Sequence, residues 1–177
     1  GRLLPGFEAH YNGSIEISEA YNRITLANQT RFTPPILVLT ALAIFAMFRT
    51  WRLTLLTMTA VLISVIWTLG LYSLMGFSFN VLSSMIVPLV VVLAVADDVH
   101  IIQHFGEARR RLSAADAHRA TVAHLLLPIF GASVTTALGM LSLGTSSVVA
   151  VREFGIGAAV GVMVDFGISI VLVPTLL

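Results

Sequence analysis

The 177-residue sequence contains no cysteine and no lysine. Without cysteine the chain forms no disulfide, offers no thiol nucleophile and holds no metal through thiolates, and its redox compartment stays undetermined. Charged residues make up only 11% of the sequence, whereas soluble domains carry about 25%. The net charge is +1, and the arginines lie mostly in short loops rather than on one stripe. We therefore expect no nucleic-acid partner.

Apolar residues fill most of the chain. They make up 57% of the sequence, with a mean hydropathy of +0.94. Several apolar runs approach or exceed the ~20 residues that a helix needs to cross a bilayer. The sequence predicts an all-α, multi-pass bundle with five membrane spans, at about residues 34–48, 53–75, 81–105, 122–143 and 149–177.

Residues 1–31 differ from the rest by their mixed polarity. The stretch FEAHYNGSIEI alternates weakly, as a strand does, and SEAYNRITLANQ resembles a short helix capped by Ser18. We expect this piece to lie outside the membrane. The first residues have no charged region leading into an apolar core, so they are not a signal peptide. We expect the chain to be a segment of a longer polypeptide.

Prolines and a capping motif predict where several helices begin or bend. Residues 34–35, two prolines, suit the first turn of the first span, where a missing N–H does no harm, and Pro88 predicts a kink in the third span. Ser113 and Asp116 have the spacing of a capping box, so a helix should begin there. We expect that helix to follow the membrane surface and to turn near Pro128 into the fourth span.

The arginines predict the orientation of the bundle. Arg49 and Arg52 lie in one loop, and residues 109–111 and Arg119 lie in another on the same side, while the opposite loops carry none before Arg152. Arginine-rich loops face the cytoplasm in most membrane proteins. With five spans the two ends of the segment lie on opposite faces, which places residues 1–31 outside the cell.

Three acids lie away from the ends of the predicted spans, near the bilayer centre: Asp97, Asp98 and Asp165. Each would oppose insertion by roughly 2.5–3.5 kcal/mol if it were charged and facing lipid. They must therefore face inward, be protonated or be paired. No lysine exists in this chain and no arginine lies in the middle of a span. Protonation, or a cationic partner from another part of the polypeptide, remains.

Two histidines follow the acid pair at helical spacing. Asp97, His100 and His104 fall at i, i+3 and i+7, on one helix face that extends about 10 Å toward the predicted cytoplasmic side. Aspartate and histidine together can carry protons. His104 at headgroup level, His100 as an interhelical donor and the acid pair as a packing device are the structural alternatives. A metal site on these three side chains would need more ligands than the spans offer, so we expect none.

Polar and small residues on the last two spans could complete a site. Ser133, Thr135 and Thr136 on the fourth span and Asp165 on the fifth could meet the acid pair at a similar depth. Packing and participation in a proton network are both open for these side chains. Thr135 with Gly139, and Gly157 with Gly161, have the spacing that lets membrane helices approach closely.

Two acids on different spans also raise the possibility of an intramembrane aspartyl protease. Asp165 lies in the sequence MVDFG, which lacks the Gly-x-Gly-Asp of such enzymes. We therefore expect no enzyme activity and no cofactor.

Three stretches together carry a resemblance to a known family. They are PLVVVLAVADDVHIIQHFGEARR, PIFGASVTTALGMLSL and VREFGIGAAVGV, with a closing LVPTLL. In order and spacing they resemble the second to sixth membrane helices of one half of a resistance-nodulation-division (RND) exporter, of the mycobacterial-membrane-protein-large (MMPL) and hopanoid-exporter branch. The same five helices are the sterol-sensing domain of Patched-like proteins.

The resemblance implies a division of the chain and a role for the acids. Residues 1–31 would be the end of an extracytoplasmic porter domain, and residues 32–177 the five-helix transmembrane domain. Asp97 and Asp98 would be the proton relay that drives export of a hydrophobic or lipid-like substrate across an inner or plasma membrane. A second half of the same polypeptide would supply a lysine partner, and a homo-oligomer is compatible with this family. The alternative is a lipid-sensing module that binds sterol without transporting it.

Overall fold

The computed structural model describes the backbone of residues 14–177. Over this range the chain is all-helical and has no strand. Its long helices are α1 (Ser14–Phe48), α2 (Trp51–Leu74), α3 (Ile86–Arg109), α4 (Ala114–Ser142) and α5 (Val149–Leu176), with short 3-10 turns η1 (Ser83–Met85) and η2 (Leu143–Thr145). Each long helix contains a segment long and apolar enough to cross a membrane. The predicted fold class and the five spans are confirmed.

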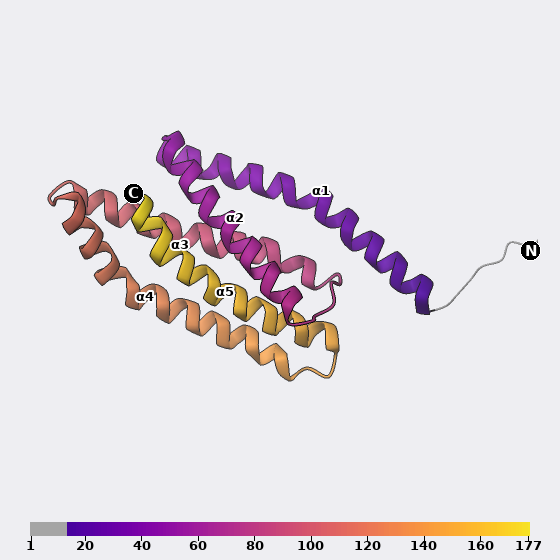
Figure 1. Ribbon diagram of the computed structural model, residues 1–177. Helices are drawn as coiled ribbons and strands as arrows, with labels where there is room; N and C mark the ends of the chain where they lie inside the picture. The colour runs from indigo at the N-terminus through magenta and orange to yellow at the C-terminus, as the bar shows by residue number, and fades with distance from the viewer. Residues whose placement is uncertain (1–13) are drawn as a thin grey trace, which may run out of the picture.

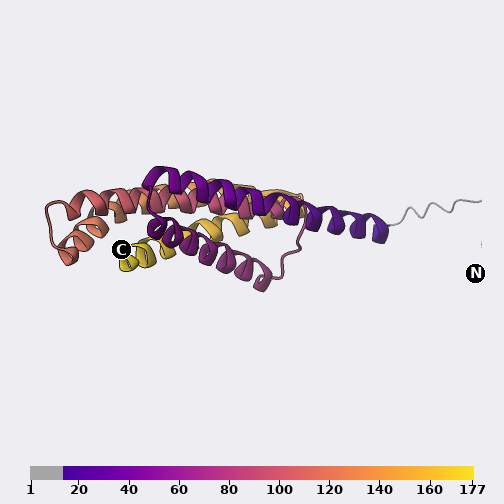
Figure 2. The ribbon, with the colours of Figure 1, turned by 90° about the horizontal axis from the view of Figure 1, so that it is seen from above.

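Successive long helices run in alternating directions (Figure 1). The α1–α2 loop, the α3–α4 loop and Leu177 lie at one end, and the α2–α3 and α4–α5 loops lie at the other. The first end carries Arg49, Arg52, residues 109–111 and Arg119, and we call it the arginine end. Figure 2 shows α2 and α5 on one side of α1 and α3. Helix α5 packs against α2, α3 and α4 and is therefore the centre of the bundle.

Helix α2 buries a row of hydroxyl side chains and exposes several large apolar ones. On α2 the buried face carries Thr54, Thr57, Ser64 and Thr68, while Leu55, Ile66 and Trp67 are exposed. This pattern is the reverse of a soluble protein. It is expected in lipid, where apolar side chains gain nothing by leaving the acyl chains and small residues let helices approach.

The N-terminal region differs from the prediction. Helix α1 begins at Ser14 and runs without a break into the first span, Thr30–Phe48. The strand predicted over residues 7–17 is wrong for residues 14–17, while residues 1–13 lie outside the described part. Ser18 lies inside the helix and does not cap it. The weak alternation had no neighbouring strand to pair with, and β-propensity depends on such context.

Two proline predictions are also wrong. Residues 34–35 lie within α1 instead of at its first turn, because the helix extends some twenty residues further toward the N-terminus than predicted. Membrane helices tolerate such prolines, since neighbouring groups form hydrogen bonds with the backbone carbonyls that proline leaves unpaired. Pro88 is the third residue of α3. It lies in the first helical turn, where no helical hydrogen bond requires the N–H that proline lacks, so the mid-helix kink that we predicted has no cause there.

The capping box at the start of α4 is confirmed. The amide of Asp116 donates to Oγ of Ser113 at 3.2 Å, and the Ser113 hydroxyl donates to the Asp116 carboxylate at 2.6 Å. Helix α4 then continues through Pro128 as one element, and its first turns slant relative to the rest (Figure 1). The predicted helix that begins at Ser113 and passes Pro128 into the fourth span is therefore present.

Candidate functional site

Of the two adjacent acids on α3, Asp98 is the more deeply buried. Its side chain is 0% exposed. Its Oδ1 accepts a 2.7 Å hydrogen bond from the hydroxyl of Ser169 on α5. Its Oδ2 is also buried and has no hydrogen-bond partner in the described part of the chain. An unpartnered buried carboxyl oxygen is costly. A protonatable position of this kind is where function is expected.

A second buried acid lies nearby on α5. Asp165 is 1% exposed, and its Oδ1 has no hydrogen-bond partner among the described residues. The Ser64 hydroxyl of α2 lies beside this carboxyl, and within the described part its oxygen is likewise unpartnered. Asp165 interacts electrostatically with Asp98 and Asp97. Asp165 thus lies within electrostatic range of both acids of α3.

A regular register of α3 against α5 sets this arrangement. Ile86 and Val90 of α3 lie against Gly157 and Gly161 of α5, one turn further along each time. Both pairs have the 71-residue separation of the Asp98–Ser169 hydrogen bond. At the same step Asp165 falls opposite Ala94, a small residue at 0% exposure. The register thus places a methyl side chain where the Asp165 carboxyl needs room.

Two glycines of α5 bring α2 close to the acids. A Cβ at Gly157 would overlap the Tyr72 ring, and one at Gly161 would lie 2.7 Å from Cγ2 of Thr68. One turn further along each helix come Asp165 and Ser64. The Gly157–Gly161 packing prediction is confirmed. The Thr135–Gly139 prediction is wrong: Thr135 is exposed and a Cβ at Gly139 would meet nothing within 4 Å, because α4 turns other residues toward α5.

The two predicted histidines differ in their contacts. Asp97 is half-buried, and His100, which is exposed, lies within electrostatic reach of it. His104 turns toward α4, where its ring stacks on His124 with centroids 4.7 Å apart and planes at 18°. Its Nδ1 is 3.2 Å from Oγ1 of Thr121. The face from Asp97 to His104 is therefore continuous along α3 but is covered by α4 at the arginine end.

The predicted hydroxyls of α4 are not brought into hydrogen bonds with the acids. Ser133 is buried and donates to the carbonyl of Ile129 at 2.9 Å. Thr135 and Thr136 both donate to the carbonyl of Ala132, at 2.9 and 2.8 Å. Each hydroxyl thus has its hydrogen-bond partner on its own helix. Within the described range, no three His, Asp or Glu side chains are placed to hold a metal ion.

The sterol-sensing family model, described as the sterol-sensing domain of SREBP cleavage-activation, matches residues 39–177. This match spans most of the chain, including all of α2 to α5. The chain belongs to the sterol-sensing domain family. No curated protein matches the chain.

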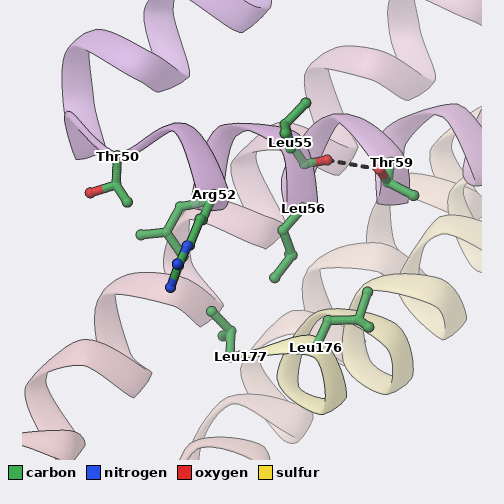
Figure 3. A pocket seen from close by; sticks show the side chains of 8 residues that line it. Thr50, Arg52, Leu55, Leu56, Thr59, Leu176 and Leu177 are labelled. Atoms are coloured by element: carbon green, nitrogen blue, oxygen red, sulfur yellow. Dashed lines mark hydrogen bonds between the residues drawn. The ribbon is translucent and has the colours of Figure 1, made fainter.

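Apart from the acids, this sterol-sensing domain has an open pocket at the arginine end, between the start of α2 and the end of α5. Its volume is about 530 Å³. Leu55, Leu56, Leu176 and Leu177 form much of the wall, and the Arg52 side chain lies on one side (Figure 3). No acid lines this pocket. It is therefore distinct from the Asp98–Asp165 site.

Sequence reasoning missed four polar partners in this sterol-sensing domain: Ser64, Ser169, Thr121 and His124. A signal existed for two of them. Ser64 belongs to a stripe of hydroxyl residues at positions 54, 57, 64 and 68, with helical spacing, and Ser169 lies one turn after Asp165. Thr121 and His124 lie one turn apart on α4. Their contact with His104 depends on how α3 and α4 pack, which a sequence does not show.

Proposed function

We propose that this sterol-sensing domain is the membrane part of a proton-driven, RND-type exporter of lipid-like or hydrophobic molecules. One observation carries the proposal. Two carboxyl groups, Asp98 and Asp165, are buried on facing helices, and each has an oxygen without a hydrogen-bond partner in the described chain. If these carboxyl groups served only to hold the helices together, each oxygen would be expected to have a hydrogen-bond partner, because an unsatisfied buried polar group destabilises the folded protein.

The mechanism follows from the different environments of Asp97 and Asp98. Asp97 is half-buried and lies near His100, so it can exchange protons with water that enters along α3. Asp98 is buried between α3 and α5. Its charge is tolerated only while donors or cations surround it. Gain or loss of a proton there therefore changes the preferred packing of α5 on α3, and this change would drive the porter domain.

The surroundings of the bundle are part of the proposal. We place the arginine end in the cytoplasm and residues 1–31 outside, as the end of a porter domain, in an inner or plasma membrane. A second half of the polypeptide would supply a cationic partner for the acids. His104 extends the proton path toward the arginine end, whereas Ser133, Thr135 and Thr136 bond to carbonyls of their own helix and lie outside this path. The exporter could also function as a homo-oligomer.

The test uses the full-length protein in liposomes with an imposed pH gradient and a fluorescent lipid as substrate. We expect Asp98→Asn to abolish gradient-driven movement of the lipid while the thermal unfolding temperature stays within a few degrees. Asp116→Asn is the matched control, because Asp116 caps α4 at the surface, and it should transport normally. Normal transport by Asp98→Asn would refute proton coupling at this site.

The family match favours a second candidate, a lipid-sensing module that binds sterol and signals to a partner. Such a module needs no proton flux. It is tested by adding sterol vesicles without a pH gradient and following limited proteolysis of the protein. A sterol-dependent change in cleavage that persists in Asp98→Asn, with no proton flux in the wild type, would favour sensing over export.

A further inference from the structure

We infer that Asp165 and Asp98 form one proton-holding pair across the α3–α5 contact, with Ser64 and Ser169 as the hydroxyls that position it. Asp165 thus carries a proton together with Asp98 and is more than a structural neighbour. The inference rests on the proposed function and deepens it. It adds a second acid, on a different helix from Asp97 and Asp98, to the proton site.

Burial is the first reason. Asp98 and Asp165 are 0% and 1% exposed, and Asp165 lies one helical turn before Ser169, which donates a hydrogen bond to Asp98. Two ionised carboxylates in one apolar site repel each other, and one of the two then keeps its proton. The α3–α5 register fixes both acids on the same contact, so neither can turn to lipid or water without separating the helices.

Hydrogen-bond accounting is the second reason. An ionised carboxylate only accepts, while a protonated one also donates. Ser169 supplies one donor to Asp98, and the Ser64 hydroxyl lies beside Asp165. Oδ2 of Asp98 and Oδ1 of Asp165 remain without partners in the described part of the chain. A proton held by either acid turns one of these oxygens into a donor for the pair.

In the described part of the chain, the other helices that pack around the pair place no further charged side chain against it. On α3 the titratable neighbours are Asp97 and His100. On α2 the buried hydroxyls without a partner in the described chain are those of Thr57 and Ser64, and neither carries a charge. The buried face of α4 carries no charged residue, and α1 contributes Ile36 and Leu37 to an apolar cluster with α2 and α3. The proton therefore reaches the pair by way of Asp97, the only half-buried acid of the three.

The experiment is infrared difference spectroscopy of the full-length protein in lipid, in which protonated carboxyl groups give separate bands between acid and alkaline samples. Asp165→Asn should remove one carboxyl signal and also move the band of Asp98, because the partner is gone. Ser169→Ala should move the Asp98 band and leave both signals present. The matched control is Ser133→Ala, whose buried hydroxyl donates to its own helix, and it should leave the spectrum unchanged.

Transport gives a second readout. Asp165→Asn should lower gradient-driven transport by about a hundredfold or more, the scale of a positioned proton-transfer group, and Asp165→Glu should restore part of it. An unchanged Asp98 band with normal transport in Asp165→Asn would overturn the inference. In that case, loss of transport in Asp98→Asn would still leave the proposed function standing.

Folding of the variants is controlled by size-exclusion chromatography. If Asp165→Asn does not fold, Ser64→Ala decides the matter, because it keeps both carboxyl groups. A moved carboxyl band in Ser64→Ala supports the pair, and a spectrum identical to that of Ser133→Ala overturns it.

Discussion

The Ser169 hydroxyl donates a 2.7 Å hydrogen bond to Oδ1 of Asp98 and so joins α5 to α3 inside the bundle. Asp98 belongs to the acid pair that the RND resemblance marks as a proton relay, whereas Ser169 has no marked role in that resemblance. Both side chains are buried, at 0% and 1% exposure. This hydrogen bond therefore ties the Asp98 carboxyl of α3 to α5.

Ser169→Ala tests this contact. It leaves the Asp98 carboxyl without its donor, and an unsatisfied buried group costs about 1–3 kcal/mol. We expect the unfolding midpoint in detergent to fall accordingly. Thr175→Ala is the control on the same helix, because the exposed Thr175 hydroxyl bonds only to carbonyls of α5. Equal stability of the two variants would show that the hydrogen bond contributes nothing.

Gly157→Ala tests the close approach of α5 to α2. The added Cβ would overlap the ring of Tyr72, which is buried. Overpacking of this kind costs about 1–3 kcal/mol, so the thermal unfolding temperature should fall. Gly167→Ala lies on the same helix with nothing within 4 Å, and it should keep or slightly raise the stability, since alanine favours helix. A Gly157→Ala variant as stable as Gly167→Ala would contradict the packing.

The five spans were predictable because a span needs only length and hydropathy, and both are local properties. The N-terminal half of α1 was not. Residues 14–29 are polar enough to resemble a separate unit, yet the helix of the first span extends back through them. Similarly, Pro88 looked like a kink because the 3-10 turn before it, which moves the start of α3 to Ile86, has no clear sequence signal.

The acids of the candidate site were found from their cost in a membrane, whereas their partners depend on helix packing. Asp165 was marked as a polar neighbour, but its place beside Ser64 follows from the register that the α5 glycines allow. His104 was placed on a face with Asp97, and its stack on His124 requires the crossing of α3 and α4. Thr135 and Gly139 have the spacing of a packing motif, but they lie on the outward face of α4. Spacing shows which residues share a face but not which helix that face meets.

The stack of His104 on His124 predicts a measurable coupling between α3 and α4. Ring pairs contribute about 0.5–1.5 kcal/mol beyond their burial. In a double-mutant cycle, His104→Ala and His124→Ala should therefore be non-additive by about that amount in denaturant unfolding. His118, whose Nδ1 lies 3.0 Å from the carbonyl of Pro174, is the control partner. His104→Ala with His118→Ala should be additive, and additivity in both cycles would rule out an energetic role for the stack.

The proposed orientation is testable because the chain has no cysteine, so each introduced thiol in it is unique. Leu112 and Ser147 are exposed and lie in loops at opposite ends of the bundle. If the arginine end is cytoplasmic, a membrane-impermeant maleimide added outside intact cells should label Ser147→Cys and not Leu112→Cys. Inverted vesicles should reverse the result. Val91→Cys, at a fully buried position, should stay unlabelled in both. The opposite pattern would turn the bundle over and refute the placement of the arginine end in the cytoplasm.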